Sequence, residues 1–202
     1  SSDELWNNMT GGISGIQKIK SLDLTGYKTT CGAEVDSQRL SEELKRYSLT
    51  AWDRTSNMAL LAAGQALRQG NLIEKYDDKP KHTNCSVIFG TGVGSAHSLH
   101  AAYMGLAEKG VRGMRPTTVP RCMANATSSM ISMQYKLQGP NFMIVCACSS
   151  STTAIGHAFR SIRDGYSDVV LCGGADAIFE PGTFAGWNNL GVMSQNQDPS
   201  KA

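Results

Sequence analysis

The feature of this chain that most constrains its fold is a series of three short, mostly apolar runs with helix-like segments between them. The runs are Cys85–Phe89, Phe142–Cys146 and Asp168–Cys172, and each leads into glycine or other small residues. A continuous apolar run of this kind is typical of a strand that is covered on both faces. The order strand, helix, strand, helix, strand therefore predicts an α/β protein with a largely buried sheet.

Helices are predicted where apolar residues recur at helical spacing and turn residues mark the ends. They are expected at 4–9, 41–47, 58–67, 97–109 and 153–163, with Ser41 as a candidate N-cap. The last of them is expected to present one apolar face, made of Ala154, Ile155, Ala158, Phe159 and Ile162. Because no repeat, low-complexity tract or change of composition marks a boundary, residues 1–202 are predicted to form a single region.

The composition argues against several classes of function. The chain has 19 basic and 17 acidic residues, a formal net charge of +2 and no block of like charges, whereas a nucleic-acid binder normally carries a basic stripe. No apolar run approaches the roughly 20 residues that a membrane helix needs, and no signal peptide opens the sequence, so we expect a soluble, cytoplasmic protein. The six cysteines include no Cys-x-x-Cys pair and no histidines at zinc-ligand spacing, so no metal site and no disulfide framework is expected.

Cys148 is the leading candidate for a catalytic residue. The segment Val145–Ser151 joins a predicted strand to a helix rich in small residues, which places Cys148 on a sharp turn at a helix N-terminus. Free backbone N–H groups there can hold an oxyanion, and the helix dipole lowers the pKa of a thiol from its free value of about 8.5. The competing interpretation of a free cysteine is a small buried hydrophobe. That interpretation is adopted for Cys31, Cys85, Cys122, Cys146 and Cys172.

A series of motifs around and before Cys148 resembles the β-ketoacyl-acyl carrier protein synthases, the condensing enzymes of the thiolase-like fold. The nucleophile region is matched by Cys146–Ser150, Ala154–Gly156 and Ile162–Ala175. Further matches follow the family order at Leu5–Ile16, Phe89–Gly94, Val119-Pro120 with Asn125, Gly139–Asn141 and Asp198-Pro199. The resemblance therefore covers nearly the whole chain.

The resemblance implies a fold of two similar α/β halves packed as αβαβα layers, with this chain covering most of the N-terminal half. It also implies a ping-pong reaction, in which the cysteine takes an acyl group from a carrier-protein thioester. A malonyl thioester then loses carbon dioxide, and its carbanion attacks the acyl-enzyme. By position, Cys148 is the nucleophile and its own N–H forms part of the oxyanion hole. No cofactor is implied, because the phosphopantetheine arm arrives on the acyl carrier protein.

Other residues receive roles through the same resemblance. Val93 is implied to line the acyl pocket, and Thr118 and Met123 match positions where a dimer partner helps to close it. Arg112 matches a basic residue that contacts the acidic carrier protein. Two further candidates for that surface are Lys45 and Arg46. For all three basic residues the alternative is a solvated face, and this alternative is favoured for the last two.

The chain departs from the family pattern in what it lacks. The family's first strand has no counterpart here. Its carboxyl half, with two catalytic histidines, a lysine and the second oxyanion N–H, is also missing, and the polar tail Ser194–Ala202 ends without a closing element. The histidines that are present lie in no such motif: His82, His97, His100 and His157. We therefore expect a truncated or split protein: either a second chain supplies the rest, or the rest lies outside this sequence. The assembly is expected to be a homodimer or a heterodimer with a chain-length factor.

Two further departures concern the pathway. Cys146 stands where the family commonly has threonine, and Trp187–Ser194 replaces a usual phenylalanine and an arginine-containing stretch. These differences favour a specialised polyketide or related pathway over ordinary fatty-acid elongation.

Three alternatives remain beside the synthase interpretation. One is a non-elongating relative, such as a decarboxylase, an acyl transferase or a structural partner; Cys148 argues against a chain-length factor, which lacks the cysteine. Another is a thiolase-fold enzyme that uses coenzyme A esters. The third, nucleotide binding at Gly90–Gly94, is disfavoured because Ser95 stands where a dinucleotide fingerprint needs glycine.

Overall fold

The computed structural model describes residues 2–49, 52–75 and 84–202. The chain divides into two compact units. The terminal unit combines Ser1–Ser37 with Ile178–Ala202, and the sheet unit is Gln38–Ala177. The sequence shows no boundary between them because the terminal unit joins two distant stretches of chain. The single region 1–202 stays a prediction.

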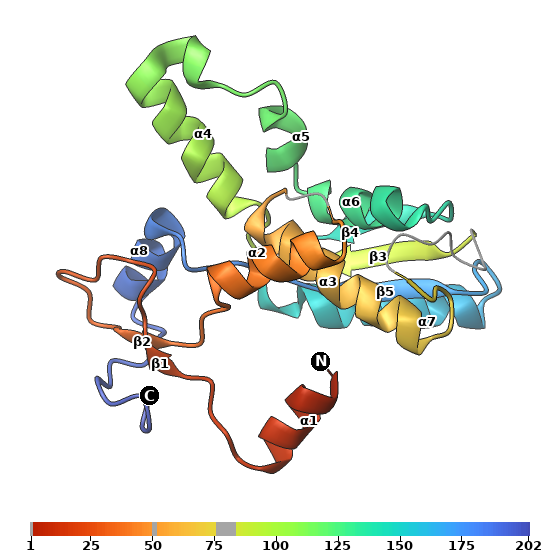
Figure 1. Cartoon of the computed structure of the whole chain (residues 1–202), viewed down its shortest axis with the longest axis horizontal. Helices are drawn as coiled ribbons and strands as arrows, with labels where there is room; N and C mark the ends of the chain where they lie inside the picture. The colour runs from red at the N-terminus through yellow and green to blue at the C-terminus, as the bar shows by residue number, and fades with distance from the viewer. Residues whose placement is uncertain (1, 50–51, 76–83) are drawn as a thin grey trace. The chain divides into compact units, whose positions relative to one another are not determined.

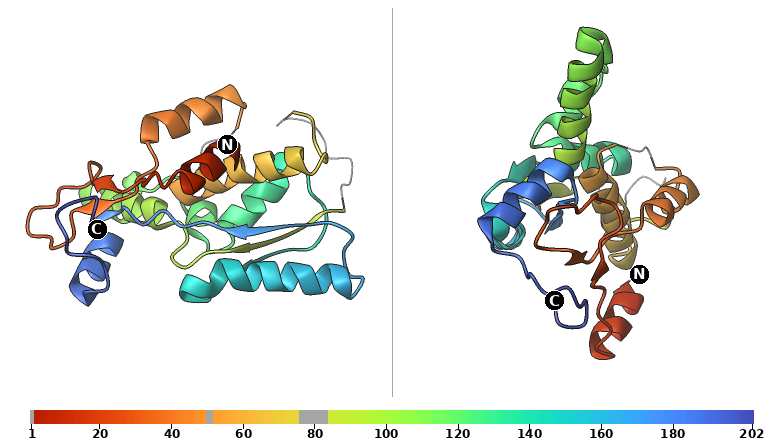
Figure 2. Two further views of the ribbon diagram at one scale, coloured as in Figure 1. Left: turned by 90° about the horizontal axis from the view of Figure 1, so that it is seen from below. Right: turned by 90° about the vertical axis from the view of Figure 1, so that its left-hand side faces the viewer.

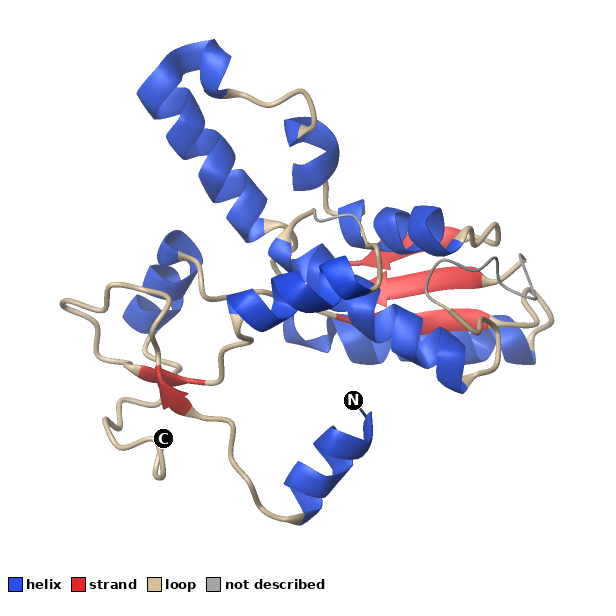
Figure 3. Ribbon diagram, viewed as in Figure 1, coloured by secondary structure: helices blue, strands red, loops and turns tan. Residues whose placement is uncertain are grey.

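The sheet unit is built on a three-stranded parallel sheet (Figures 1 and 3). Its strands are β3 (Ser86–Gly90), β4 (Asn141–Ile144) and β5 (Val170–Gly174), in the order β4-β3-β5. Ile88 of the central strand pairs with Phe142 on one side and Cys172 on the other. The three predicted strands are present, but only β3 is buried throughout. The residues of β4 and β5 are half-buried or exposed, so the prediction of a largely buried sheet is wrong for these two strands. The second predicted strand, β4, ends at Ile144, so the assignment of Cys146 to a buried strand was wrong.

Helices cover both faces of this sheet, which makes three layers within the unit (Figure 2, left). The helices α3 (Arg54–Gln69) and α6 (Ala126–Tyr135) cover one face, and α7 (Ser150–Arg163) covers the other. Successive side chains of a strand point to opposite faces. Accordingly, Val87 and Phe89 join the cluster under α3 and α6, while Ile88 packs with Ala154 and Ala158 of α7.

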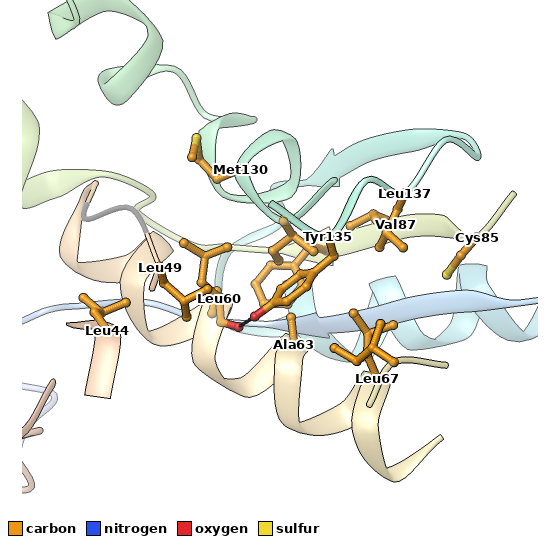
Figure 4. Packing of buried hydrophobic residues seen from close by; sticks show 14 of the residues in the cluster. Leu44, Leu49, Leu60, Ala63, Leu67, Cys85, Val87, Met130, Tyr135 and Leu137 are labelled. Atoms are coloured by element: carbon orange, nitrogen blue, oxygen red, sulfur yellow. Dashed lines mark hydrogen bonds between the residues drawn. The ribbon is translucent and has the colours of Figure 1, made fainter. Parts of the chain in front are cut away.

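The main hydrophobic core lies on the α3–α6 face (Figure 4). Leu60 and Leu67 of α3 and Tyr135 of α6 are fully buried in it. The hydroxyl of Tyr135 donates to the backbone carbonyl oxygen of Leu60 at 2.7 Å. A buried phenol needs such a partner, so this bond offsets the desolvation cost of the hydroxyl while the aromatic ring fills the core.

The N-termini of two helices meet at one buried carboxylate. Asp53 precedes α3, and its Oδ1 accepts from the backbone N–H of Thr55 at 2.9 Å. Its Oδ2 accepts from Ser98 N–H at 2.9 Å in the first turn of α4 (Ala96–Lys109). A carboxylate at a helix N-terminus satisfies free N–H groups and complements the helix dipole. Asp53 therefore orients α3 and α4 together, and Figure 1 shows α4 running away from the sheet.

Several helical boundaries differ from the sequence predictions. The helix expected at 41–47 is α2 (Ser37–Arg46), which begins four residues earlier, so Ser41 is inside the helix and not its N-cap. The helices not predicted from the sequence are α5 (Thr118–Cys122), α6 and α8 (Pro181–Leu190), together with the short 3₁₀ helices η1 (Gly110–Gly113) and η2 (Ala147–Ser149).

The apolar face predicted for α7 is only half covered. Ala154 and Ala158 are buried, but Ile155, Phe159 and Ile162 are 52%, 65% and 48% exposed. The two alanines of the predicted face pack against the sheet. The three larger apolar residues face outward within the described chain. Large exposed apolar residues clustered on one surface are typical of an interaction site.

In the terminal unit, side-chain contacts join the two stretches of chain that form it. It contains α1 (Ser2–Thr10), a short antiparallel pair of β1 (Gln17–Lys18) with β2 (Cys31–Gly32), and α8. The side-chain Oδ1 of Asn188 on α8 accepts from Lys28 N–H at 2.9 Å and Thr29 N–H at 3.3 Å. Tyr27 and Phe179 both pack on the ring of Phe184. These contacts hold α8 against the 27–32 segment.

Within the described ranges, no helix combines the length and the apolar character needed to cross a bilayer.

Candidate active site

Cys148 lies on a strained turn between a strand and a helix. The chain leaves β4 at Ile144, passes through η2, which contains Cys148, and enters α7 at Ser150. Ala147, directly before Cys148, has a φ of +53°, a left-handed conformation that a residue with a Cβ rarely adopts. The Cys148 side chain is exposed. The predicted position at the strand–helix junction is therefore confirmed, and the turn presents the thiol outward.

Serine hydroxyls hold this turn in shape. Ser150 is buried, and its Oγ accepts from the backbone N–H of Cys146 at 2.9 Å. The same hydroxyl donates to the carbonyl oxygens of Ala147 at 2.7 Å and Thr91 at 2.9 Å. Ser149 donates to the carbonyl oxygen of Cys146 at 2.8 Å. Bonds on both sides of Cys148 thus offset the cost of the left-handed Ala147.

Glycines at the ends of β3 and β5 allow the helix to approach the sheet closely. A Cβ at Gly90 would lie 2.5 Å from the carbonyl carbon and oxygen of Ser150, and one at Gly174 would lie 2.7 Å from the Cβ of Ser151. No larger residue fits at these positions without moving the backbone. The first turn of α7, just after Cys148, therefore packs directly against the C-terminal ends of β3 and β5.

The glycine loop after β3 is held by Asp176, a residue that the sequence analysis missed. Its Oδ2 accepts from Gly92 N–H at 2.8 Å, and its Oδ1 accepts from Val93 N–H at 2.9 Å and Gly94 N–H at 3.3 Å. Consecutive N–H groups that converge on one anion form a nest of the kind that binds phosphate. Here the protein's own carboxylate fills the nest, which argues further against nucleotide binding. The sequence signal that could have indicated Asp176 is its position as an acidic residue two residues after Gly174, where a predicted strand ends.

Cys146 is an exposed thiol and not a core residue, which corrects the sequence interpretation. Its Sγ lies 3.4 Å from Ser149 Oγ and 3.4 Å from Thr153 Oγ1. Hydrogen bonds from Ser149 first and then Thr153 lower the pKa of the Cys146 thiol, because hydroxyl donors stabilise the thiolate.

The remaining cysteines form a contrast with Cys146. Burial raises the pKa of the thiols of Cys85, Cys122 and Cys172. Cys31 and Cys85 are buried as predicted, whereas Cys122 and Cys172 are only half-buried.

The structure brings together some of the other candidate residues. Val93 lies in the Asp176-bound loop and is 43% exposed. Arg112 in η1 and Thr118 at the start of α5 line one cleft of about 570 Å³ between α4, η1 and α5. This cleft is basic, since Lys109, Arg115 and Arg121 also line it and Glu108 is its acidic residue.

Three further candidates, like Val93, do not line that cleft. Met123 follows α5 and is exposed, but it does not line the cleft. Lys45 and Arg46 end α2, where Arg46 pairs with Glu43 at 3.4 Å and stacks over the ring of Tyr47 at 5.4 Å. These local contacts favour the solvated-face interpretation of Arg46.

The described histidines form no catalytic cluster with Cys148. His97 and His100 are on α4 and His157 is on α7, while His82 falls outside the described residues. Over residues 2–49, 52–75 and 84–202, no group of three or more His, Cys, Asp or Glu side chains is placed to hold a metal ion.

Comparisons with known proteins agree with this geometry. The family model described as "Beta-ketoacyl synthase, N-terminal domain" matches residues 1–202. The 3-oxoacyl-(acyl-carrier-protein) synthase 2 of Synechocystis sp. is 29% identical over 200 residues, which are 98% of this chain and 47% of that protein. Nodulation protein E of Rhizobium sp. is 33% identical over 190 residues, covering 94% of this chain and 46% of that protein.

The fold is similar to that of solved ketosynthases. The structure of the ishigamide ketosynthase/chain length factor matches with a TM-score of 0.80 at 24% identity, over 96% of this chain and 48% of that one. The thiolase-like fold class, predicted from sequence, is therefore confirmed, and the chain spans about half the length of the relatives it matches. With the family model matched from end to end, the chain belongs to the β-ketoacyl synthase family and carries its N-terminal domain.

Proposed function

We propose that this chain supplies the acyl-accepting nucleophile of a β-ketoacyl synthase. The thiolate of Cys148 attacks the carbonyl carbon of an acyl thioester on acyl carrier protein; the new thioester forms on Cys148 and the carrier thiol leaves. Malonyl-acyl carrier protein then loses carbon dioxide. Its carbanion attacks the acyl-enzyme carbonyl, which releases the β-ketoacyl-carrier and the Cys148 thiolate. The observation that carries the proposal is the exposed thiol on the Ala147 turn, in a chain matched throughout by the family model.

The surroundings of Cys148 suit an acyl-enzyme. Its turn leads into α7, whose N-cap residue Ser149 makes no side-chain capping bond, and the dipole of that helix favours negative charge at this end. The backbone N–H of Cys148 is proposed to bind the oxyanion that forms on the carbonyl. Val93 is proposed to line the acyl pocket, with Thr118 and Met123 closing it in a dimer.

The carrier protein is proposed as the partner that delivers both substrates. Its phosphopantetheine arm bears the acyl and malonyl groups, so no further cofactor is proposed. The basic residues that line the α4–α5 cleft support docking of an acidic partner, with Arg112 as its main contact. Lys45 and Arg46 are proposed as peripheral contacts of the same partner.

A second half is proposed to complete the enzyme, on this polypeptide or on a separate chain. The exposed Ile155, Phe159 and Ile162 on α7 support a further layer against this helix. That half would bring the residues that decarboxylate malonate. We further propose a cytoplasmic dimer, either of identical subunits or with a chain-length factor, in fatty-acid or polyketide synthesis.

Intact-mass spectrometry of the assembled enzyme with acyl-acyl carrier protein tests the proposal. We expect one acyl adduct on the wild type and none on Cys148→Ala. Cys146→Ala is the matched control, since it removes an exposed thiol two residues away and should keep the adduct. A folded wild type that takes no acyl group would refute the proposal, and an adduct that survives in Cys148→Ala would place the nucleophile elsewhere.

A further inference from the structure

We infer that Asp176 is a positioning residue that sets the acyl-chain selectivity of the site. Its carboxylate fixes the main chain that carries Val93 next to the Cys148 turn. The inference rests on the proposed function, because it concerns the fit of an acyl group to that site.

The contacts of Asp176 converge on a single short loop. Three consecutive backbone N–H groups, those of Gly92, Val93 and Gly94, donate to its two carboxylate oxygens at 2.8 to 3.3 Å. The hydroxyl of Thr91 donates to Oδ1 at 2.8 Å. Hydrogen bonds to an ionised acceptor are shorter and stronger than neutral ones. Gly94 also bonds to the hydroxyls of Thr91 and Thr55, each at 2.9 Å. Asp176 is the side chain that holds the N–H groups of Gly92 and Val93.

This loop also touches the nucleophile turn. The carbonyl oxygen of Thr91 accepts from Ser150 Oγ at 2.9 Å, and the site of a Cβ on Gly92 lies 3.5 Å from the carbonyl oxygen of Ala147. The loop therefore contacts both Asp176 and the residues that flank Cys148. A shift of the loop changes the position of Val93 relative to the thiol.

The exposure of Val93 argues for a role beyond stability. Its side chain is 43% exposed and apolar, yet its N–H and those of both neighbours are held in place. Ordering a loop costs conformational entropy, and an exposed valine recovers little of that cost through burial. A loop that is ordered although its valine is exposed is explained if Val93 forms a preorganised wall of the acyl pocket.

Glu180 is a matched control carboxylate in the terminal unit. It accepts from Gly182 N–H at 3.0 Å, from Thr183 N–H at 2.9 Å and from the Thr183 hydroxyl at 2.9 Å. These bonds cap α8 and touch no candidate site residue. Glu180→Gln therefore reports the loss of a carboxylate acceptor that caps α8 and not the Val93 loop.

The test compares Cys148 acylation by acyl-acyl carrier proteins of increasing chain length with its alkylation by iodoacetamide, in the assembled enzyme. Asp176→Asn loses the charge and one acceptor oxygen. We expect its acylation by long chains to fall about 10- to 100-fold, because small misplacements of a binding wall have effects of this size. The loss should be smaller for acetyl groups. Alkylation, which needs no acyl pocket, should stay within about twofold of wild type. Asp176→Glu should recover part of the long-chain rate, and Glu180→Gln should keep the wild-type profile.

The outcomes separate the two proposals. If Asp176→Asn loses alkylation and acylation equally at every chain length, or loses neither, Asp176 is a structural residue and the inference is wrong while the proposed function stands. If wild-type Cys148 is alkylated but accepts no acyl group of any length, the proposed function fails and this inference fails with it.

Discussion

The two faces of the sheet differ in how much apolar surface their helices bury. On one face, α3 and α6 enclose a large core that includes Leu60 and Tyr135. On the other, α7 buries only small residues against Ile88 and leaves its larger apolar side chains exposed. The candidate nucleophile lies just before α7, the helix on the less covered face. The candidate site therefore lies beside the less covered face, against which the second half is proposed to pack.

Leu60→Ala and Phe159→Ala test this contrast with the largest effects. Leu60 is fully buried, so its truncation should lower the free energy of unfolding by about 2–5 kcal/mol. Phe159 is mostly exposed, and its truncation should change the stability of this chain by less than about 0.5 kcal/mol. Urea unfolding measures both. In the assembled enzyme the effect of Phe159→Ala should rise toward that of a core residue; if it stays negligible there, the second half does not cover α7.

Gly90→Ala on β3 and Gly156→Ala on α7 compare the side of α7 that packs on the sheet with a position that contacts nothing. The new Cβ at Gly90 collides with the Ser150 backbone, so we expect a loss of about 1–3 kcal/mol from overpacking. Gly156 lies within α7 with nothing within 4 Å of its Cβ position, and alanine there should stabilise the helix by about 0.5–1 kcal/mol. Thermal unfolding of the two variants should therefore move in opposite directions. Equal shifts would mean that α7 is not seated against the end of β3.

Ser149→Ala gives the smallest effect, a change in the pH dependence of Cys146 alkylation. In the wild type the Ser149 hydroxyl is the largest cause of the lowered Cys146 pKa. Its removal should raise that pKa, so the alkylation midpoint should move to higher pH. Thr153→Val removes the second cause and should shift the midpoint less. Peptide mapping after iodoacetamide treatment separates Cys146 from Cys148, and an unchanged midpoint in both variants would contradict hydrogen bonding of the two hydroxyls to the Cys146 thiolate.

The strands and the Cys148 turn were predictable because their signals are local. An apolar run that ends in small residues indicates that a strand is present and that a turn follows it. Cys146 was misassigned because β4 ends before it, and the apolar run alone does not mark that end. The sequence predicts Ser41 as an N-cap, whereas α2 already begins at Ser37, because the polar start of this helix shows little hydrophobic periodicity.

The missed features depend on contacts between distant residues. The helix α6 is rich in serine and threonine and has little hydrophobic periodicity, yet Thr127 is buried because its hydroxyl bonds with that of Ser56 at 2.9 Å. Asp176 acts on Gly92, 84 residues earlier in the chain. Family resemblance supplied Val93 as a candidate, but the carboxylate that holds it is visible only once β3 and β5 are adjacent.

The terminal unit combines the beginning and the end of this sequence, and this affects the order in which its parts can fold during synthesis. Asn188 bonds to Lys28, and 160 residues separate them in the chain. At about 5–20 residues per second, the 27–32 segment waits roughly 8–32 s on the ribosome for its partner, while the sheet unit can already form. Its exposed backbone groups are unprotected during that interval. Because residues 33–187 are all made during this interval, slow codons placed among them should change the yield of folded protein more than the same codons placed after residue 188.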